Sequence, residues 1–232
     1  MSLGTGDRAG ILGRVREALR EKAPLKHPAE RSAGGEPTTA HFREWLPPVG
    51  PSIDEKYALF AKLSEQLRSE LLPCPDVAHA AAAVSALAQQ LNWKTLALHR
   101  GSLLDQLAPL LPPELALIYV DAGYDKDALE ACDAGVTECD LLVAQTGSVC
   151  VTSTSAGGRV LSVLPPHHFV LARRSQLVTD LSEAYSTLAT RYRENYPSMI
   201  SFITGPSRTG DIERILVLGA HGPKRLTLLL LP

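Results

Sequence analysis

The chain has 232 residues, of which 45% are hydrophobic and 21% charged, a balance typical of a folded protein and not of a disordered one. Its formal net charge of −2 excludes a dedicated nucleic-acid-binding protein. The charges are unevenly spread, because residues 151–232 carry nine basic and five acidic side chains whereas residues 51–150 carry six and fourteen. A site for an anionic ligand is therefore expected in the C-terminal third.

The sequence contains no apolar run long enough for a membrane span, since the apolar tail Leu226–Leu231 has only the length of a strand. The first residues lack the apolar core of a secretory signal. The four cysteines, Cys74, Cys132, Cys139 and Cys150, are too few for a disulfide framework and too widely spaced for zinc or iron–sulfur ligation. We expect a reduced, cytoplasmic protein that itself holds no metal or cofactor.

Residues 1–50 are expected to form a separate N-terminal part. Gly10–Lys22 has apolar residues at helical spacing, which predicts a short amphipathic helix. The stretch from 23 to 51 is rich in proline and glycine and cannot bury a core, so it is expected to be an extended arm. Phe42 and Trp45 in this arm are expected to pack on the main body, with contact to a partner as the less favoured alternative.

Residues 51–232 are predicted to form an α/β domain. Ser52 and Glu55 have the spacing of a capping box, which predicts a helix from Ser52 to the prolines at Pro73 and Pro75. Asp76 is expected to cap a second helix. Further elements are a strand at 95–99, a helix at 102–110, a strand at 115–121 and a helix at 125–132. Helices that alternate with short apolar runs predict a parallel sheet.

Beyond Gly135 the pattern becomes rich in strands. The expected elements are strands at 141–145, 148–154, 160–164 and 168–173 joined as hairpins, a helix at 181–192, a strand at 199–204, a glycine-rich loop leading to a short helix at 211–214, and strands at 215–218 and 226–231. Together these elements predict an α/β fold with three layers (α/β/α), a mixed but mainly parallel sheet and a hairpin-rich region.

The segment from Thr204 to Glu213 is the clearest candidate binding site. Glycines at both ends allow tight turns, so the backbone N–H groups, the Arg208 guanidinium and nearby hydroxyls can surround a phosphate or carboxylate. The residues expected to contribute are Gly205, Ser207, Arg208, Thr209 and Asp211. A simple capped turn, with Arg208 paired to an acidic neighbour, is an equally good explanation of the same pattern.

A second polar turn contributes further candidates. Thr137 follows Gly135, and Gln145, Thr146 and Gly147 lie between two apolar runs. Such a turn is most often a hairpin tip. The functional hypothesis is that it faces the Arg208 loop and donates hydrogen bonds to the same ligand.

Other polar residues are expected to have ordinary structural roles. Glu138 and Asp140 are the carboxylates nearest the second turn and are expected in a solvated turn. His167 and His168 are adjacent on a predicted strand, so they point to opposite faces and cannot easily share a metal. These histidines and His221 are expected at the surface or with their hydrogen bonds satisfied.

These patterns together resemble the lactate utilization protein C family. The matching residues are Gly135–Thr137 and Ala144–Ser148, Gly158, Arg159, Ser162 and Leu164-Pro165, Gly205–Glu213, Gly219 with His221–Pro223, and the N-terminal helix from Ile11 to Leu19. The resemblance covers almost the whole chain, and its C-terminal motif is the specific part.

The resemblance implies a fold similar to that of the sugar-phosphate isomerase and CoA-transferase superfamily. It also implies a cytoplasmic subunit encoded with two iron–sulfur proteins, the three being required for oxidation of L-lactate to pyruvate. Two residues depart from the family pattern: Gln145 stands where glutamate is usual, and Gly210 where alanine is usual. Because the related transferases use a glutamate nucleophile, Gln145 weakens a transferase hypothesis.

The sequence supports three functions of different kinds. The first is a ligand-binding or accessory subunit of a lactate-oxidising system, in which Arg208 holds a carboxylate or phosphate. The second is a free-standing isomerase or acyl-transfer enzyme, which needs a catalytic carboxylate from Glu138, Asp140 or Asp211. The third is an interaction module whose N-terminal residues 1–50 dock onto partner proteins.

Overall fold

The computed structural model describes residues 46–121, 123–210, 216–218 and 222–232, together with positions 10, 13–14, 16–17 and 20. The chain divides into two units, Met1–Glu44 and Trp45–Pro232. Positions 10, 13–14 and 16–17 of the predicted N-terminal helix are helical and exposed. Phe42 and Trp45, which were expected to pack on the main body, lie outside the described residues. Asp211 and His221 also lie outside them.

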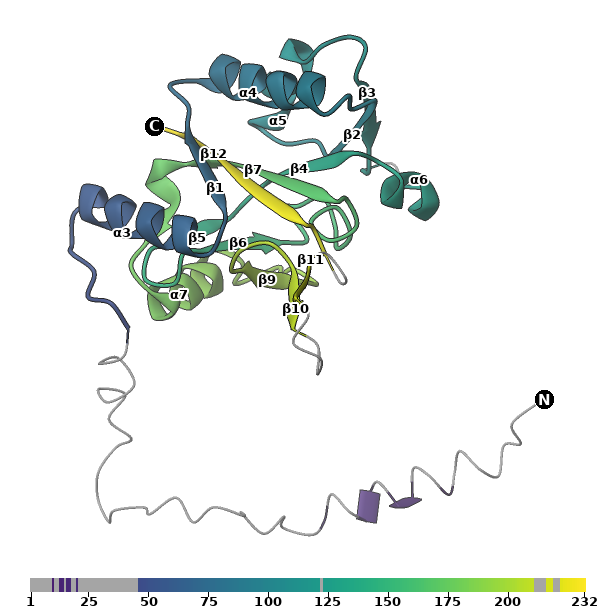
Figure 1. The fold of residues 1–232 in the computed structure, drawn as a ribbon. Coiled ribbons are helices and arrows are strands. Elements are labelled where there is room, and N and C mark those ends of the chain that lie inside the picture. The colour runs from purple at the N-terminus through teal and green to yellow at the C-terminus, as the bar shows by residue number, and fades with distance from the viewer. Residues whose placement is uncertain are drawn as a thin grey trace. The chain divides into compact units, whose positions relative to one another are not determined.

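A six-stranded sheet in the order β1-β12-β7-β4-β2-β3 forms the centre of the second unit (Figure 1). All of its strand pairs are parallel. The strands are β1 (Glu70–Pro73), β2 (Thr95–Leu98), β3 (Ala116–Tyr119), β4 (Ala134–Glu138), β7 (His167–Arg173) and β12 (Arg225–Leu231). The predicted α/β fold with a mainly parallel sheet is thereby confirmed.

The hairpin-rich region forms a smaller sheet of its own. Four strands pair in the order β8-β5-β6-β9, and they are β5 (Leu141–Val143), β6 (Ser148–Thr152), β8 (Leu177–Val178) and β9 (Ile200–Ile203). Within it, β5 and β6 form an antiparallel hairpin. A separate antiparallel ribbon consists of β10 (Arg208–Gly210) and β11 (Leu216–Leu218).

The three longer helices and the short helix Lys126–Glu130 begin at capping Ser or Asp side chains. The described helices are α3 (Ile53–Gln66), α4 (Val77–Gln90), α5 (Leu104–Leu107) with the short 3₁₀ turn η1 (Ala108–Leu110), α6 (Lys126–Glu130), the 3₁₀ turn η2 (Arg174–Gln176) and α7 (Leu181–Arg191). The capping box of Ser52 and Glu55 is present at the start of α3, and Asp76 caps α4 as predicted. None of the helices in the described part of the chain is long and apolar enough to cross a membrane.

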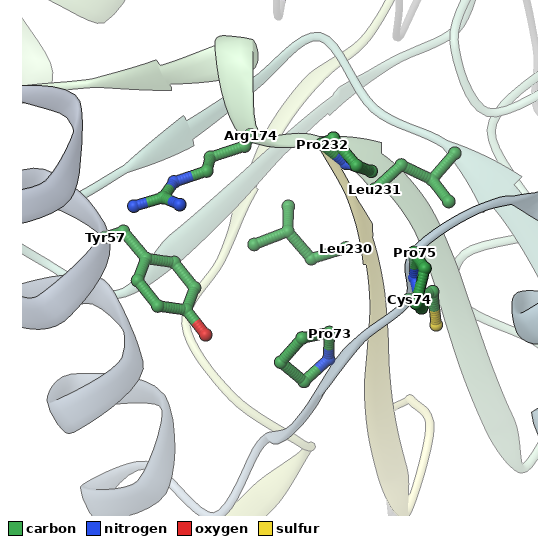
Figure 2. A pocket seen from close by; sticks show the side chains of 8 residues that line it. All are labelled: Tyr57, Pro73, Cys74, Pro75, Arg174, Leu230, Leu231 and Pro232. Carbon is green, nitrogen blue, oxygen red and sulfur yellow. The ribbon is translucent and has the colours of Figure 1, made fainter.

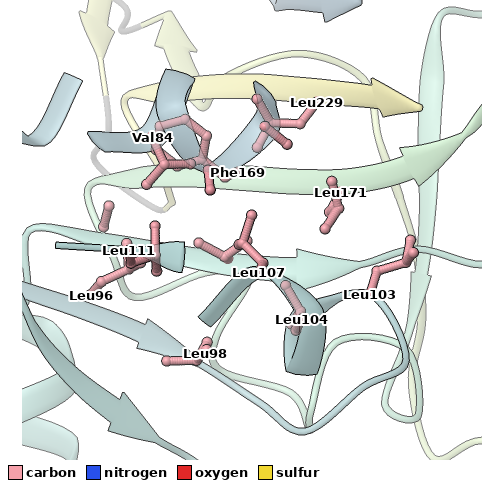
Figure 3. Close-up of a cluster of buried hydrophobic side chains, with 14 of the residues drawn as sticks. Val84, Leu96, Leu98, Leu103, Leu104, Leu107, Leu111, Phe169, Leu171 and Leu229 are labelled. Atoms are coloured by element: carbon pink, nitrogen blue, oxygen red, sulfur yellow. The ribbon is translucent and has the colours of Figure 1, made fainter. Parts of the chain in front are cut away.

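The core consists of layers on the two faces of the main sheet. On one face, α4 and α5 cover buried side chains that include Val84, Leu104 and Phe169 (Figure 3). On the other face, a second cluster joins Val170 and Leu228 of the main sheet to Phe60 of α3 and to the strands of the smaller sheet. Because α7 packs behind that smaller sheet, the hairpin region adds a layer between the main sheet and the last helix (Figure 1).

Helix α3 is shorter than the helix that the sequence predicts from Ser52 to Pro73. It ends at Gln66 and not at Pro73, because the chain turns at Arg68, whose φ of 63° is left-handed, and then enters strand β1. The missed strand is only four residues long and lies at the edge of the sheet, where Pro73 is tolerated because it need not donate a ladder hydrogen bond.

Three further segments differ from the predicted elements. Residues 160–164 form turns and not a strand. The segment Ala134–Glu138, for which no element was predicted, is the buried strand β4 in the middle of the sheet. Residues 208–210, expected in a loop that leads to a helix, form strand β10. Strand β4 forms through pairing with the distant strands β2 and β7, which periodicity does not report.

His167 and His168 are both buried and lie on β7. His168 shares a hydrogen bond of 2.9 Å between its Nε2 and Thr137 Oγ1, and His167 stacks on Phe169 with 4.3 Å between ring centroids. Burial lowers the pKa of His167 to about 4 and that of His168 to about 3, because a low-dielectric surrounding disfavours the charged ring. Both histidines are therefore neutral in the native protein near pH 7.

Stability is predicted to fall as the pH drops from about 6.5 to 4. In that window the unfolded chain protonates His167 and His168, while the native protein does not, so protons favour unfolding by about 1.4 kcal/mol per pH unit for each histidine. Urea unfolding at several pH values measures this slope, and His168→Gln should reduce it by about half. His79→Gln, at an exposed position, is the control. An unchanged slope in the His168 variant would contradict the prediction.

Candidate functional site

The two polar turns predicted from the sequence meet at the C-terminal end of α3. Ser148, directly after the β5–β6 turn, shares a hydrogen bond of 2.7 Å between its Oγ and the Oγ1 of Thr204. Gly147 and Gly205 have φ values of 65° and 92°, and a Cβ atom on either would lie 2.9 Å from atoms of Leu67. Glycine is required at both positions because the turn and the close approach to α3 leave no space for a side chain.

Arg208 lies at this junction. Its guanidinium donates a hydrogen bond to the backbone carbonyl of Leu67, the C-cap residue of α3. A cation at this end of a helix is favoured because the last carbonyls carry partial negative charge. The acidic neighbours that the sequence offers as partners of Arg208 lie outside the described residues, so the capped-turn alternative stays a prediction.

A cavity of about 180 Å³ lies beside Arg208 at the amino ends of β1 and β12. It is smaller than the roughly 300–1,000 Å³ of pockets for drug-sized ligands, so its size suits a small molecule. Its lining includes four basic side chains and one acidic one. The described residues that line it are Arg68, Glu70, Pro206, Arg208, Lys224, Arg225, Leu226 and Thr227.

The four basic side chains give this cavity a positive field. Among the side chains that the structure describes, none of Arg68, Arg208, Lys224 and Arg225 takes part in an ion pair shorter than 4.0 Å. A group of cations that outnumbers nearby carboxylates attracts an anion, most strongly where a concave surface limits solvent. We therefore take these residues, with Glu70 and Thr227, as the candidate anion site.

Arg68 reaches the site through an unusual backbone conformation. It occupies the first position after the helix cap, where glycine is common, and has a φ of 63°. The surrounding bonds are those of a Schellman motif, because Arg68 N donates to Glu65 O and Ser69 N donates to Ser64 O, each over 2.9 Å. A non-glycine residue held in this conformation is often found at functional sites.

Glu70 is linked from the cavity into the core by a chain of hydrogen bonds. The Thr227 hydroxyl (Oγ1) donates to Glu70 Oε2 over 2.8 Å. The same Thr227 Oγ1 lies 2.8 Å from His167 Nε2. Thr227 and His167 are both buried, whereas Glu70 is exposed. Among the described residues of the cavity lining, the Glu70 carboxylate is thus anchored by a buried hydroxyl group.

Some of the predicted site residues lie away from this cavity. Thr137 is fully buried and bonds to His168. Gln145 uses its side-chain amide to donate to the Pro47 carbonyl over 3.1 Å. Ser207 donates from its backbone N to the Pro223 carbonyl over 2.8 Å. Thr209 belongs to β10, but its side chain is outside the described part, as is the whole of Asp211.

Sequence reasoning missed most of the residues that line the cavity. Arg68 and Glu70 were expected inside a helix, and Lys224 and Arg225 follow the Gly222-Pro223 pair without a recognisable motif. The signal that could have found them is the excess of basic residues in the C-terminal third. Their convergence depends on the parallel pairing of β1 with β12, which places Glu70 opposite Thr227.

Glu138 is the last residue of β4, at the sheet edge where an open α/β sheet commonly binds ligands. Strand β2 lies between β3 and β4 in the sheet, so β3 is added on one side of β2 and β4 on the other. The order of strand addition therefore reverses between β2 and β4, at whose carboxyl ends ligands commonly bind. There the Glu138 Oε1 accepts hydrogen bonds from Leu103 N at 2.7 Å and Leu104 N at 3.2 Å. Glu138 therefore has a capping role at α5 and does not lie in a solvated turn.

Asp140 is also not in a solvated turn. It is 3% exposed, and its Oδ1 accepts hydrogen bonds from Arg191 Nη1 at 2.8 Å and from the Tyr192 hydroxyl at 2.6 Å. The bond to the Asp140 carboxylate, after the larger effect of desolvation, helps to raise the pKa of Tyr192. Asp140 thus joins the smaller sheet to α7.

A second cavity, of about 310 Å³, lies at the carboxyl ends of β1 and β12 (Figure 2). Prolines and leucines form most of its lining. Its basic side chain, Arg174, lies over the Tyr57 ring at 4.6 Å from the centroid and pairs with Asp54. Because this cation already has an acidic partner, the second cavity is a poorer site for an anion than the first.

The four cysteines pack into four different groups of buried side chains. Cys74, Cys139, Cys150 and Cys132 each belong to a separate cluster. Burial raises the pKa of Cys132 to about 11 and that of Cys150 to about 12, so these thiols stay protonated near neutral pH. Among the residues that can be described, no three His, Cys, Asp or Glu side chains gather as metal ligands do.

Comparison with known proteins relates the chain to one family. Residues 120–231 match the family model described as the LUD domain. The chain is 35% identical to lactate utilization protein C of Geobacillus sp. (strain WCH70) over an aligned stretch of 103 residues. This stretch covers 44% of this chain and 43% of the relative. The chain is 39% identical over 98 residues to the protein of that name from Halalkalibacterium halodurans, covering 41% and 43%.

A further relative is lactate utilization protein C of Deinococcus radiodurans, 33% identical over 120 residues, covering 51% of this chain and 56% of the relative. The matched stretch thus spans about half the length of these curated relatives. The crystal structure of a DUF162 family protein from Deinococcus radiodurans superposes with a TM-score of 0.63 at 21% identity, covering 79% of this chain and 100% of that one. This likeness shows the shared fold.

Glu138→Ala is predicted to destabilise the protein by about 1–3 kcal/mol, because it leaves the N–H groups of Leu103 and Leu104 without their acceptor. Glu138→Gln keeps an acceptor oxygen and should cost less. Urea unfolding measures both, with the exposed Glu130→Ala as control. An alanine variant as stable as the wild type would show that Glu138 has no capping role.

Proposed function

We propose that the chain is the anion-binding subunit of a lactate utilization system, because residues 120–231 match the LUD-domain model and the similar curated proteins are named lactate utilization protein C. The cavity beside Arg208 holds the carboxylate of a small organic acid, and L-lactate is the ligand that the names of the relatives point to. The observation that carries the proposal is the set of four basic side chains around this cavity of about 180 Å³.

In this proposal the chain takes no part in electron transfer. The oxidation of L-lactate to pyruvate releases two electrons, and iron–sulfur clusters in partner subunits receive them. The packing of the four cysteines into separate buried clusters supports this division, since cluster ligands must converge on one centre. The chain then acts in the cytoplasm, where its thiols remain reduced.

A free-standing isomerase or transferase is less well supported. Such an enzyme needs a carboxylate placed for catalysis. At the position where the family usually has glutamate this chain has Gln145, and its side-chain amide donates a hydrogen bond to the Pro47 carbonyl. Glu138 and Asp140 already serve as hydrogen-bond acceptors for backbone and side-chain donors. Ligand binding without covalent catalysis requires none of these groups.

Arg208→Ala is predicted to weaken the binding of L-lactate about tenfold or more, because it removes a charged hydrogen-bond donor from the cavity. Isothermal titration of the full chain with sodium L-lactate measures the Kd. Arg193→Ala is the matched control, since Arg193 is an exposed arginine that does not line the cavity. Equal affinity in wild type and the Arg208 variant would overturn the assignment of the site.

Partner binding is tested separately. Co-expression of the chain with the two iron–sulfur proteins that the proposal requires, followed by size-exclusion chromatography, should give a joint peak with iron–sulfur absorbance. The proposal that the chain is a subunit fails if the proteins elute apart at micromolar concentration while L-lactate binding is retained.

A further inference from the structure

Glu70 is the exception in the positively charged cavity. It lines the same space as Arg68, Arg208, Lys224 and Arg225, yet it forms no ion pair shorter than 4.0 Å with these described side chains. Its Oε2 instead accepts a hydrogen bond of 2.8 Å from the buried hydroxyl of Thr227. A carboxylate lying among cations without pairing to them reduces the affinity of the cavity for any anion, so its presence needs an explanation.

The positions of the hydrogen atoms in the hydrogen-bonded series Glu70–Thr227–His167 follow from the number of donors that each side chain has. Thr227 has one hydroxyl hydrogen, and an ionised Glu70 can only accept, so that hydrogen lies between Thr227 Oγ1 and Glu70 Oε2. The 2.8 Å contact from His167 Nε2 to Thr227 Oγ1 must then use a hydrogen on the histidine. His167 is therefore the tautomer with its hydrogen on Nε2.

This assignment orients the carboxylate. The ring of His167 is held by stacking on Phe169 at 4.3 Å and by an edge contact with Trp93 at 5.3 Å between centroids. Because the ring directs its N–H at Thr227, the hydroxyl hydrogen of Thr227 is directed at Glu70. The other carboxylate oxygen, Oε1, accepts no hydrogen bond from the described residues, and it is available to a ligand in the cavity.

A carboxylate acceptor beside a set of cations distinguishes between two kinds of small acid. A ligand with a hydroxyl group next to its carboxylate can place the carboxylate among the cations and donate its hydroxyl hydrogen to Glu70. A 2-keto acid presents only lone pairs at the same position, and these are repelled by the charge of Glu70. A site with a buried or anchored polar partner rejects the analogue that lacks the matching group.

We propose that Glu70, held in place by Thr227 and His167, makes this cavity select a 2-hydroxy carboxylate over the corresponding 2-keto acid. The inference rests on the proposed function, since it assumes that the cavity beside Arg208 binds a small carboxylate. Within it, Glu70 determines specificity by contact with the ligand, and Thr227 and His167 are positioning residues that act through Glu70.

The test compares the Kd of L-lactate with the Kd of pyruvate for the full chain by isothermal titration. The wild type should bind L-lactate about tenfold or more tightly, the size expected for a hydrogen bond to a charged acceptor. Glu70→Gln should bring the ratio of the two Kd values close to one, because a neutral amide can donate to a keto oxygen as well as accept from a hydroxyl. Its affinity for pyruvate should rise.

Two variants of Thr227 test the positioning role. Thr227→Val removes the hydroxyl at nearly constant volume and should lower the ratio of the Kd values, whereas Thr227→Ser keeps the hydroxyl and should restore it. A purely structural role would change stability or both Kd values together and leave the ratio unchanged. Glu65→Gln, an exposed residue of α3 outside the cavity lining, is the control for loss of a nearby negative charge.

The outcomes separate this inference from the function on which it rests. If the wild type binds neither acid, the proposed function fails. If it binds both acids equally, or if Glu70→Gln keeps the wild-type ratio, the anion site stands and the role of Glu70 is wrong. The Glu70 variant decides the question even if Thr227→Val does not fold, because Glu70 is exposed and its replacement leaves the core unchanged.

Discussion

At the last turn of α3, the Leu67 carbonyl accepts a hydrogen bond from Arg208 while Gly147 and Gly205 pack against the same residue. This contact joins the hairpin layer, the β9–β10 connection and the helix that precedes β1. The basic residues of the cavity come from these same segments and from the start of β12, so their convergence depends on it. A larger side chain at either glycine would separate the turns from the helix and open the site.

The charge of the site and the neutrality of the layer beneath it belong together. Arg225 and Lys224 begin β12, and the neighbouring strand β7 begins with two buried histidines. Burial, with a further contribution from Arg225, keeps His167 uncharged. A protonated ring there would place a fifth positive charge against the cavity and would lack an acceptor for its Nδ1, which has no partner among the described residues.

Local signals predicted the α/β class, the cap at Ser52 and Glu55, and most helices, because capping residues and helical spacing act over a few positions. They failed at β1 and β4, whose short sequences become strands through parallel pairing with distant segments. For the site, Arg208 was found from its glycine-rich surroundings. Glu70 and Thr227 were not found from the sequence, because these two residues are 157 positions apart in the chain and meet only where β1 pairs with β12.

The left-handed backbone at Arg68 has a consequence for the evolution and engineering of this protein. Glycine would fit the helix terminus better, since an L-amino acid in this conformation costs roughly 1 kcal/mol or more. Arginine at this position therefore lowers stability while it adds a cation to the cavity. Selection for thermal robustness alone would drift toward glycine here, and persistence of the arginine in a stabilised library would mark the position as one retained for affinity.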